Sequence, residues 1–209
     1  MELQVFNCDQ GSAEWYLARL GVPTMSEAAT ISARPGPKGG VPVTRRTYMR
    51  KLAGEIVTQT PMERFTNGAM ERGHEQEPEA RALYAMVADV EPVQVGFLKR
   101  GRIGCSPDSL IGDDGMLEIK TKAAHLQIEV LETDEVPAEH IAQLQGQLMV
   151  AGRRWVDFVS YCPGLPPFIK RVHRDELYIA TLKIACEEFV TELDALVERI
   201  RNYQQKKAA

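Results

Sequence analysis

The pattern of hydrophobic and polar positions predicts helices towards both ends of the chain and strands in its middle. Apolar residues on one helical face predict long helices at 44–58, 138–151 and 175–203. Short apolar runs bounded by turn residues predict strands at 93–99, 102–105, 116–121, 155–161 and 168–172. We therefore expect an α/β (α+β-like) fold, with a central mixed β-sheet flanked by helices and a long C-terminal helix, as a single domain over residues 1–209.

Capping signals mark the beginning of two short helices near the N-terminus. Ser12 is a candidate N-cap for the first helix, and Gly21 ends it. Thr24 and Glu27 have the spacing of a capping box, which predicts a second helix that runs to about residue 33. These signals place two helices before the first long one.

Three further segments have a clear local signature. Residues 34–43 are rich in proline and glycine, which predicts a mobile surface loop. A helical region at 67–87 contains Pro78, so we expect either a kink there or the start of a new helix. The C-terminal helix carries an apolar stripe typical of core packing, formed by Leu182, Ala185, Phe189, Leu193, Leu196 and Ile200.

The segment from Cys105 to Lys122 contains the most distinctive arrangement of polar residues. Its centre, 112–115, reads Gly-Asp-Asp-Gly, which is a strong hairpin-turn signal. We expect the strands 102–105 and 116–121 to pair across this turn, which would bring Asp108 close to Glu118.

Strand alternation then predicts which side chains share a face. Glu118 and Lys120 are two residues apart and point to the same side, while Leu117 and Ile119 point to the opposite, apolar side. Two carboxylates and an ammonium group at one place suit a hard divalent cation such as Mg²⁺. The alternative is a solvated hairpin that carries two acids and a basic strand end, because Asp…Glu-x-Lys patterns also occur by chance.

Composition and charge limit the class of protein. The chain has 209 residues, of which 44% are hydrophobic and 26% are charged, as in ordinary globular proteins. Its net charge of −4 allows nucleic-acid binding only through local basic patches. The four cysteines lack zinc-site spacing and are expected to be reduced thiols. Without a signal peptide or an apolar run of membrane-spanning length, the sequence predicts a soluble cytoplasmic protein with no membrane partner.

Five separated blocks resemble one family in the right order. They read WYLARLGVPTMSE, ERGHEQEPEARALY, CSPDSL, LEIK and HIAQLQGQLMVAG. The chain resembles the phage λ-type exonucleases, the YqaJ-like viral recombinase nucleases of the PD-(D/E)xK superfamily. The resemblance spans most of the chain and implies a PD-(D/E)xK nuclease core.

The resemblance implies a role for each residue of the hairpin site. Asp108 and Glu118 match the metal ligands of the family, the carbonyl of Ile119 would complete the protein ligands, and Lys120 matches the catalytic lysine. Glu77 matches a further acid at the same site, although it also reads as a capping carboxylate before Pro78. The implied cofactor is Mg²⁺, with Mn²⁺ as a substitute.

Other positions of the same site are less well defined by the sequence. Glu75 and Glu79 are the alternatives to Glu77 if the register of this block is shifted. Gln143 and Gln145 match a Gln-x-Gln block, and Gln145 is the better candidate to contact the active-site water or phosphate. Either glutamine also reads as an ordinary amide on a helix surface.

The resemblance also implies a pocket for a 5′-terminal phosphate, formed by Arg19, Ser26 and Ser106. An arginine fork suits phosphate oxygens, and hydroxyl groups add hydrogen bonds. The alternative for Ser26 is simple helix capping, and for Arg19 it is an ion pair with Glu14 or Glu27. Candidate contacts to the DNA backbone are Arg45, Arg46, Arg50, Lys51, Lys99, Arg100 and Arg102, each of which also reads as part of a solvated face.

The implied activity is a Mg²⁺-dependent 5′→3′ exonuclease that digests one strand of linear double-stranded DNA and leaves 3′ overhangs for strand annealing. Implied partners are DNA ends, two further copies in a ring-shaped homotrimer and a phage single-strand annealing protein, in the cytoplasm of a bacterial host. Two other functions fit the same core: a PD-(D/E)xK endonuclease, and a non-catalytic module that binds DNA ends. The clustered acids argue against the binding module, because they would face a polyanion.

Overall fold

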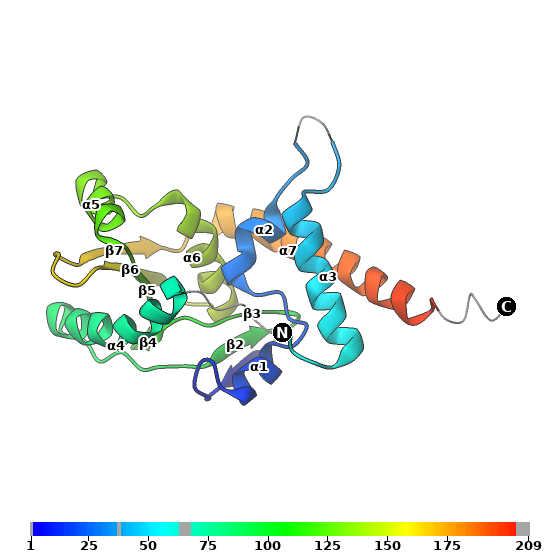
Figure 1. Cartoon of the computed structure of the whole chain (residues 1–209), viewed down its shortest axis with the longest axis horizontal. Coiled ribbons are helices and arrows are strands. Elements are labelled where there is room, and N and C mark those ends of the chain that lie inside the picture. Colours follow the sequence, from blue (N-terminus) through cyan, green and yellow to red (C-terminus); the bar gives the residue numbers. More distant parts are fainter. Residues whose placement is uncertain (1, 37–38, 63–67, 204–209) are drawn as a thin grey trace.

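A computed structural model describes residues 2–36, 39–62 and 68–203 and has mixed α/β architecture (Figure 1). The helices are α1 (Ala13–Arg19), α2 (Ala28–Ser32), α3 (Val43–Thr58), α4 (Gly68–Ala88), α5 (Ala124–Thr133), α6 (Ala138–Ala151) and α7 (Glu176–Arg201), with a 3-10 turn at Met25–Glu27. The strands are β1 (Leu3–Phe6), β2 (Phe97–Arg100), β3 (Ile103–Cys105), β4 (Ser109–Ile111), β5 (Gly115–Thr121), β6 (Trp155–Tyr161) and β7 (Phe168–His173). The expected fold class, with its mixed sheet and long C-terminal helix, is confirmed.

The strands form two sheets. One is antiparallel with the order β1-β2-β3, and the other is mixed with the order β4-β5-β6-β7. In the mixed sheet β5 runs parallel to β6 and antiparallel to β4. The chain crosses from the first sheet to the second in the three residues Ser106, Pro107 and Asp108, which separate β3 from β4. These three residues therefore occupy the junction between the sheets.

The two faces of the mixed sheet are covered by different helices (Figure 1). Leu117 and Ile119 of β5 pack in one cluster with Ala80 and Tyr84 of α4. Met116 points to the other face and belongs to the main core. That core also contains Leu144 and Leu148 of α6 and the apolar stripe of α7 up to Leu193, whereas Ile200 is exposed. The alternation predicted for β5 therefore separates two hydrophobic layers.

Several local predictions hold. Ser12 caps α1, because its hydroxyl accepts a hydrogen bond from the Trp15 N–H at 3.2 Å. Gly21 follows α1 with φ +67°, a left-handed conformation that glycine tolerates. The four cysteines are free thiols. Within the described part of the chain, no helix is long and apolar enough to cross a membrane.

Other local predictions need correction. Strand 102–105 does not pair with 116–121; β3 pairs with β2, and the short strand β4 after Pro107 pairs with β5. The run at 93–99 forms a strand only from Phe97, while Val93 makes an isolated bridge with Leu110.

Other segments also differ from the prediction. The segment after Thr24 begins as a 3-10 turn in which the Thr24 side chain makes no capping bond. Helix α4 continues through Pro78, so no new helix begins there, and the kink stays a prediction. The sequence pattern missed α5 and β1, and residues 37–38 and 67 of predicted segments lie outside the described residues.

Candidate active site

Glu118 is the centre of a polar cluster on the face of β5 that α6 covers. Its side chain is only 2% exposed. Its two carboxylate oxygens accept hydrogen bonds from Lys120 Nζ at 2.6 Å, Gln143 Nε2 at 2.5 Å and Gln147 Nε2 at 2.6 Å. A buried carboxylate needs such partners, because an isolated charge is costly to remove from water. The predicted pairing of Glu118 with Lys120 on one face is confirmed.

Helix periodicity explains which glutamines reach Glu118. Gln143 and Gln147 are four residues apart and therefore share one face of α6. Gln145 lies on a different side, where its amide donates to the His173 carbonyl at 2.9 Å and accepts from the Asp175 N–H at 3.0 Å. The preference for Gln145 over Gln143 is thus not supported by the geometry, because Gln145 ties α6 to the start of α7 and points away from the cluster.

Asp108 reaches the same cluster from the junction between the sheets. Its Oδ2 accepts the Ile119 N–H at 2.5 Å, and its own N–H donates to the Leu117 carbonyl at 3.1 Å. Burial raises the pKa of Asp108 well above its ordinary value, and the negative charges of Glu118 and Glu77 add to this effect. The hydrogen bonds from Asp108 to β5 therefore hold this acid close to Glu118, although two negative charges at these positions would repel each other.

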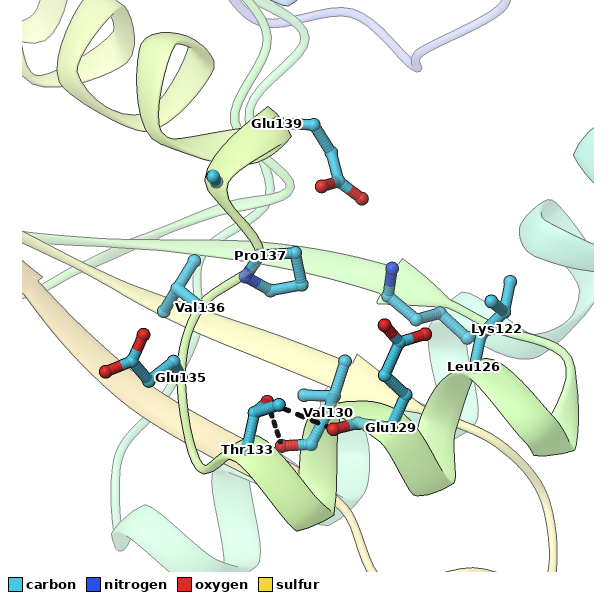
Figure 2. Close-up of a pocket in the computed structure, with 10 residues that line it drawn as sticks. Lys122, Leu126, Glu129, Val130, Thr133, Glu135, Val136, Pro137 and Glu139 are labelled. Atoms are coloured by element: carbon cyan, nitrogen blue, oxygen red, sulfur yellow. Dashed lines mark hydrogen bonds between the residues drawn. The ribbon is translucent and has the colours of Figure 1, made fainter.

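The two lysines at the end of β5 have different surroundings. Burial alone would lower the pKa of Lys120, but the carboxylates of Glu118 and Asp108 outweigh it and raise that pKa. Lys122 instead lines a pocket of about 350 Å³ between α5 and the start of α6, together with Glu129 and Glu139 (Figure 2). The structure thus distinguishes Lys120, which is bonded to Glu118, from the neighbouring Lys122.

Glu77 lies on α4 at the edge of this cluster. Its carboxylate forms an ion pair with Arg81 one turn later, and Arg81 also donates to Ser109 Oγ at 3.1 Å. Pro78 does not prevent this, since α4 is continuous. The negative charge of Glu77 adds to burial and to the charge of Glu118 in raising the pKa of Asp108. Its assignment as a further metal ligand stays a prediction, as do the alternatives Glu75, which is exposed, and Glu79.

The cluster has the donor chemistry that Mg²⁺ requires. Asp108 and Glu118 offer carboxylate oxygens, and the main chain of Ile119, which follows Glu118, bonds to Asp108. Among residues 2–36, 39–62 and 68–203, no three His, Cys, Asp or Glu side chains group into a metal site by themselves. A bound Mg²⁺ would therefore depend on two carboxylates, one carbonyl and water, which is a common arrangement for this ion.

Arg19 and Ser106 are brought together in a second polar site beside the junction. Arg19 NH1 donates to Ser106 Oγ at 3.0 Å, and Trp15 Nε1 donates to the same oxygen at 2.9 Å. The Arg19 guanidinium lies over the Trp15 ring at 4.0 Å. With two N–H groups bonded to its oxygen, the Ser106 hydroxyl directs its own proton elsewhere, as a donor suited to an anion.

Ser26 belongs to the same region but is less directly connected. It is exposed, and its hydroxyl lies 3.1 Å from Thr24 Oγ1. A bridge between Thr24 and Gly104 brings this segment to β3, two residues before Ser106. The expected capped α-helix at this point is replaced by a 3-10 turn, so the phosphate-binding prediction for Ser26 depends on its hydroxyl alone.

The basic residues of α3 divide into buried and exposed members. Arg45 is 7% exposed, forms a two-bond ion pair with Glu192 at 2.6 and 3.0 Å, and donates to the Ile31 carbonyl. This arginine therefore fastens α3 to α7, and its role as a contact to DNA stays a prediction. Arg46, Arg50 and Lys51 are exposed, as the prediction requires.

Three further basic residues lie on β2 and after it. Arg100 donates to the Val150 carbonyl at 2.7 Å, and Arg102 pairs with Asp194 at 2.8 and 2.9 Å, so both have structural contacts. Lys99 is half-buried on β2.

Sequence reasoning missed several residues that the structure places at the two sites. Gln147, Trp15 and Arg81 each lie four residues from a residue already assigned to a site, so helical spacing was the available signal. His140 precedes Gln143 by one turn and stacks on Phe158. Burial, followed by the positive charges of Lys120 and Lys122, lowers the pKa of His140 to about 4, so this residue is neutral at physiological pH.

Comparison with known proteins places these sites in a wider group. A family model described as YqaJ-like viral recombinase domain matches residues 14–154. Comparison with curated protein sequences finds no match.

Solved structures include close matches to the whole chain. LHK-Exo, an alkaline exonuclease from Laribacter hongkongensis, was crystallised in complex with dAMP, and that structure is 35% identical with a TM-score of 0.84. The alignment covers 95% of this chain and 100% of that chain. A second structure of LHK-Exo gives a TM-score of 0.83 over 93% and 99% of the two chains. A phage related exonuclease from Haemophilus somnus 129PT, 14% identical with a TM-score of 0.64 over 86% and 96%, shares the fold.

Proposed function

The chain belongs to the family of YqaJ-like viral recombinase domains, and from this premise we propose that it is a Mg²⁺-dependent 5′→3′ exonuclease acting on linear double-stranded DNA. It starts at 5′-phosphorylated ends, digests one strand and leaves a 3′ overhang for recombination by strand annealing. The observation that carries the proposal is the cluster of buried Glu118 with Lys120 and Asp108, beside the Arg19–Ser106 site. The likeness to an alkaline exonuclease supports it.

The proposed metal site uses Asp108, Glu118 and the carbonyl of Ile119, with Glu77 assisting. When bound there, Mg²⁺ would stabilise negative charge on the attacking and leaving oxygens of a phosphodiester. Mn²⁺ offers the same coordination chemistry and would replace it. Burial, and after it the negative charges of Glu118 and Glu77, raise the pKa of Asp108, which fits a site whose charge is completed by a cation.

The side chains around the proposed metal site orient the attacking water and the carboxylate of Glu118. Lys120 is fixed by its bond to Glu118 and positions the attacking water for in-line displacement at phosphorus. Gln143 and Gln147 occupy two hydrogen-bonding positions of Glu118, which leaves a defined set of lone pairs for the metal. These amides therefore orient a proposed ligand without adding charge.

The reaction also explains a phosphate pocket beside the metal site. Water adds to phosphorus and the bond from phosphorus to the 3′-oxygen breaks, so the departing nucleotide carries a 3′-hydroxyl group and the shortened strand carries a new 5′-phosphate. Each cut thus regenerates the group that Arg19, Ser106 and Ser26 would bind. A basic fork beside a hydroxyl donor is well suited to that dianion.

The same proposal extends to assembly and partners. We infer a homotrimer that encloses DNA and a phage-type single-strand annealing protein that receives the 3′ overhang, in the cytoplasm of a bacterial host. The exposed residues Arg46, Arg50 and Lys51 are available to contact DNA phosphates. A local basic surface of this kind reconciles DNA binding with the net charge of −4.

One assay tests the activity. Linear duplex DNA with labelled 5′-phosphate ends and closed circular DNA are incubated with the protein, with and without Mg²⁺. We expect Mg²⁺-dependent release of label from the linear duplex and an intact circle. Cleavage of the circle would show an endonuclease, and stable binding of linear ends without any release would show a binding module.

A second assay tests the phosphate pocket. Linear duplexes with 5′-hydroxyl ends should be digested more slowly than those with 5′-phosphate ends, and Arg19→Ala should reduce this difference. An Arg19→Ala protein that keeps the full preference would remove the pocket from the account.

A further inference from the structure

The junction between the two sheets connects both proposed sites within three residues. Ser106, in the phosphate site, is separated from Asp108, in the metal site, by Pro107 alone. Both ends of this junction have their own support: Trp15 and Arg19 bond to Ser106, and Asp108 bonds to the main chain of β5. The spacing between the phosphate and metal sites therefore depends on a short, externally held segment.

Gln10 supports the middle of the junction. Its Nε2 donates one hydrogen bond to the Pro107 carbonyl at 3.0 Å and another to the Val95 carbonyl at 3.1 Å. Both N–H groups of the amide are thus used, and both acceptors belong to buried residues. Proline has no N–H of its own to anchor the chain here, so the carbonyl is the one main-chain group of Pro107 that can be held.

The main chain around Gln10 is itself well placed for this task. Gly11 has φ +89° and the Ser12 N–H bonds to the Asp9 carbonyl at 3.0 Å, so Gln10 lies in a tight turn directly before the capped helix α1. One turn into α1, Trp15 bonds to the carbonyl of Gly96, the neighbour of Val95. The turn and α1 therefore fasten the junction to the segment 95–96 at two points.

We propose that Gln10 is a positioning residue that fixes the distance between the 5′-phosphate site and the metal site. In this way it sets the length of the released product at one nucleotide. This inference rests on the proposed function and adds the number of nucleotides removed at each cut. The 5′-phosphate held beside Ser106 determines which phosphodiester lies at Asp108. Gln10 acts through the Pro107 main chain and does not contact the reacting atoms.

Two substitutions separate positioning from mere folding. Gln10→Met keeps the length of the side chain and removes both N–H donors. Gln10→Glu places a carboxylate against two carbonyl oxygens, which repels them. Gln94→Met and Gln94→Glu are matched controls, because Gln94 is exposed and lines the same cleft of about 590 Å³ as Gln10, Glu77 and Arg81.

The experiment measures product length from a linear duplex with a ³²P-labelled 5′-phosphate in the presence of Mg²⁺. We expect wild type and both Gln94 variants to release labelled mononucleotide only. The Gln10 variants should release labelled dinucleotides as well, and should lose about tenfold of the preference for 5′-phosphate over 5′-hydroxyl ends. The change should be larger for Gln10→Glu than for Gln10→Met.

Gln10 variants that release only mononucleotide with the wild-type end preference would overturn the inference, even if their turnover is slower or their melting temperature is lower. If wild type itself releases no label from 5′-phosphate ends, the proposed function fails, independently of Gln10. If wild type releases labelled products longer than one nucleotide, the proposed function stands and the inference about product length is overturned.

Discussion

Two buried acids on neighbouring strands show how differently this fold uses carboxylates. Glu118 on β5 and Asp157 on β6 are 2% and 4% exposed. Because Leu117 pairs with Asp157 and Glu118 pairs with Phe158, the two acids face opposite sides of the sheet. Asp157 accepts two bonds from Arg171 at 2.8 and 2.9 Å and one from Tyr84 at 2.7 Å, so its charge is matched by one arginine.

Glu118 has a different balance of charge. Its partners are two neutral amides and Lys120, and Lys120 also lies in the field of Asp108 and Glu77. Burial therefore does not distinguish Glu118 from Asp157, since both are buried and each accepts three hydrogen bonds. The distinction lies in neighbouring charge: Asp157 is paired with Arg171, whereas Glu118 and Asp108 both lie near Lys120.

The largest expected effect comes from removing charge on each side of the sheet. Asp108→Asn should lower kcat/KM by about 10³-fold or more, because a metal ligand is lost. Ionising Asp108 costs more in the folded than in the unfolded chain, so stability falls as pH rises from the ordinary pKa of an aspartate towards its raised pKa. The melting temperature of Asp108→Asn above that range should therefore be unchanged or higher.

Asp157→Asn should lower stability and leave activity largely intact, the opposite of Asp108→Asn. It breaks a paired buried charge and should cost about 2 kcal/mol of stability, which is less than for a fully buried pair because Arg171 is partly exposed. Its cleavage rate at a temperature where it is folded should remain within a few-fold of wild type. Loss of cleavage in folded Asp157→Asn, or normal cleavage by Asp108→Asn, would remove the contrast between the two faces.

Lys120→Ala should abolish cleavage while Mg²⁺ binding persists. Lys120 is the group expected to position water, whereas the carboxylates remain able to bind the metal. Mg²⁺-dependent change in melting temperature reports binding separately from cleavage of labelled duplex. Lys122→Ala is the matched control, since Lys122 lies in a different pocket, and its activity should be close to wild type. Full cleavage by Lys120→Ala would refute the assignment.

The smallest expected effects sharpen the comparison within α6. Gln143→Ala removes one bond to Glu118 and should lower kcat by roughly tenfold to a hundredfold, with little loss of stability. Gln145→Ala removes contacts to His173 and Asp175, so it should cost about 1–2 kcal/mol of stability with kcat unchanged. Equal loss of kcat in the two variants would mean that the two sides of α6 are not functionally distinct.

The sequence correctly predicted the placement of side chains that depends on local periodicity. Strand alternation placed Glu118 and Lys120 on one face and Leu117 on the other, and the structure has this arrangement. The structure brings Gln143 and Gln147 to Glu118 but turns Gln145 away, because a step of two residues on a helix changes the face whereas a step of four preserves it.

Local sequence patterns could not predict contacts between residues that lie far apart in the chain. Arg45 has the charge of a DNA contact, but its partner Glu192 is 147 residues further along the chain. The strand β4 has only three residues, so its pairing with β5 gave no periodic signal. Gln10 likewise reads as an ordinary turn residue until the fold brings Pro107 to its amide.

The central claim is that the cluster around Glu118 carries out Mg²⁺-dependent hydrolysis of DNA. The most direct test measures the initial rate of label release from a 5′-phosphorylated linear duplex over a Mg²⁺ titration, for wild type, Glu118→Gln and Asp157→Asn at equal folded concentration. We predict saturable Mg²⁺-dependent release for wild type and Asp157→Asn, and no release above the metal-free background for Glu118→Gln at any Mg²⁺ concentration. A Glu118→Gln protein with the rate and Mg²⁺ dependence of wild type would contradict the account.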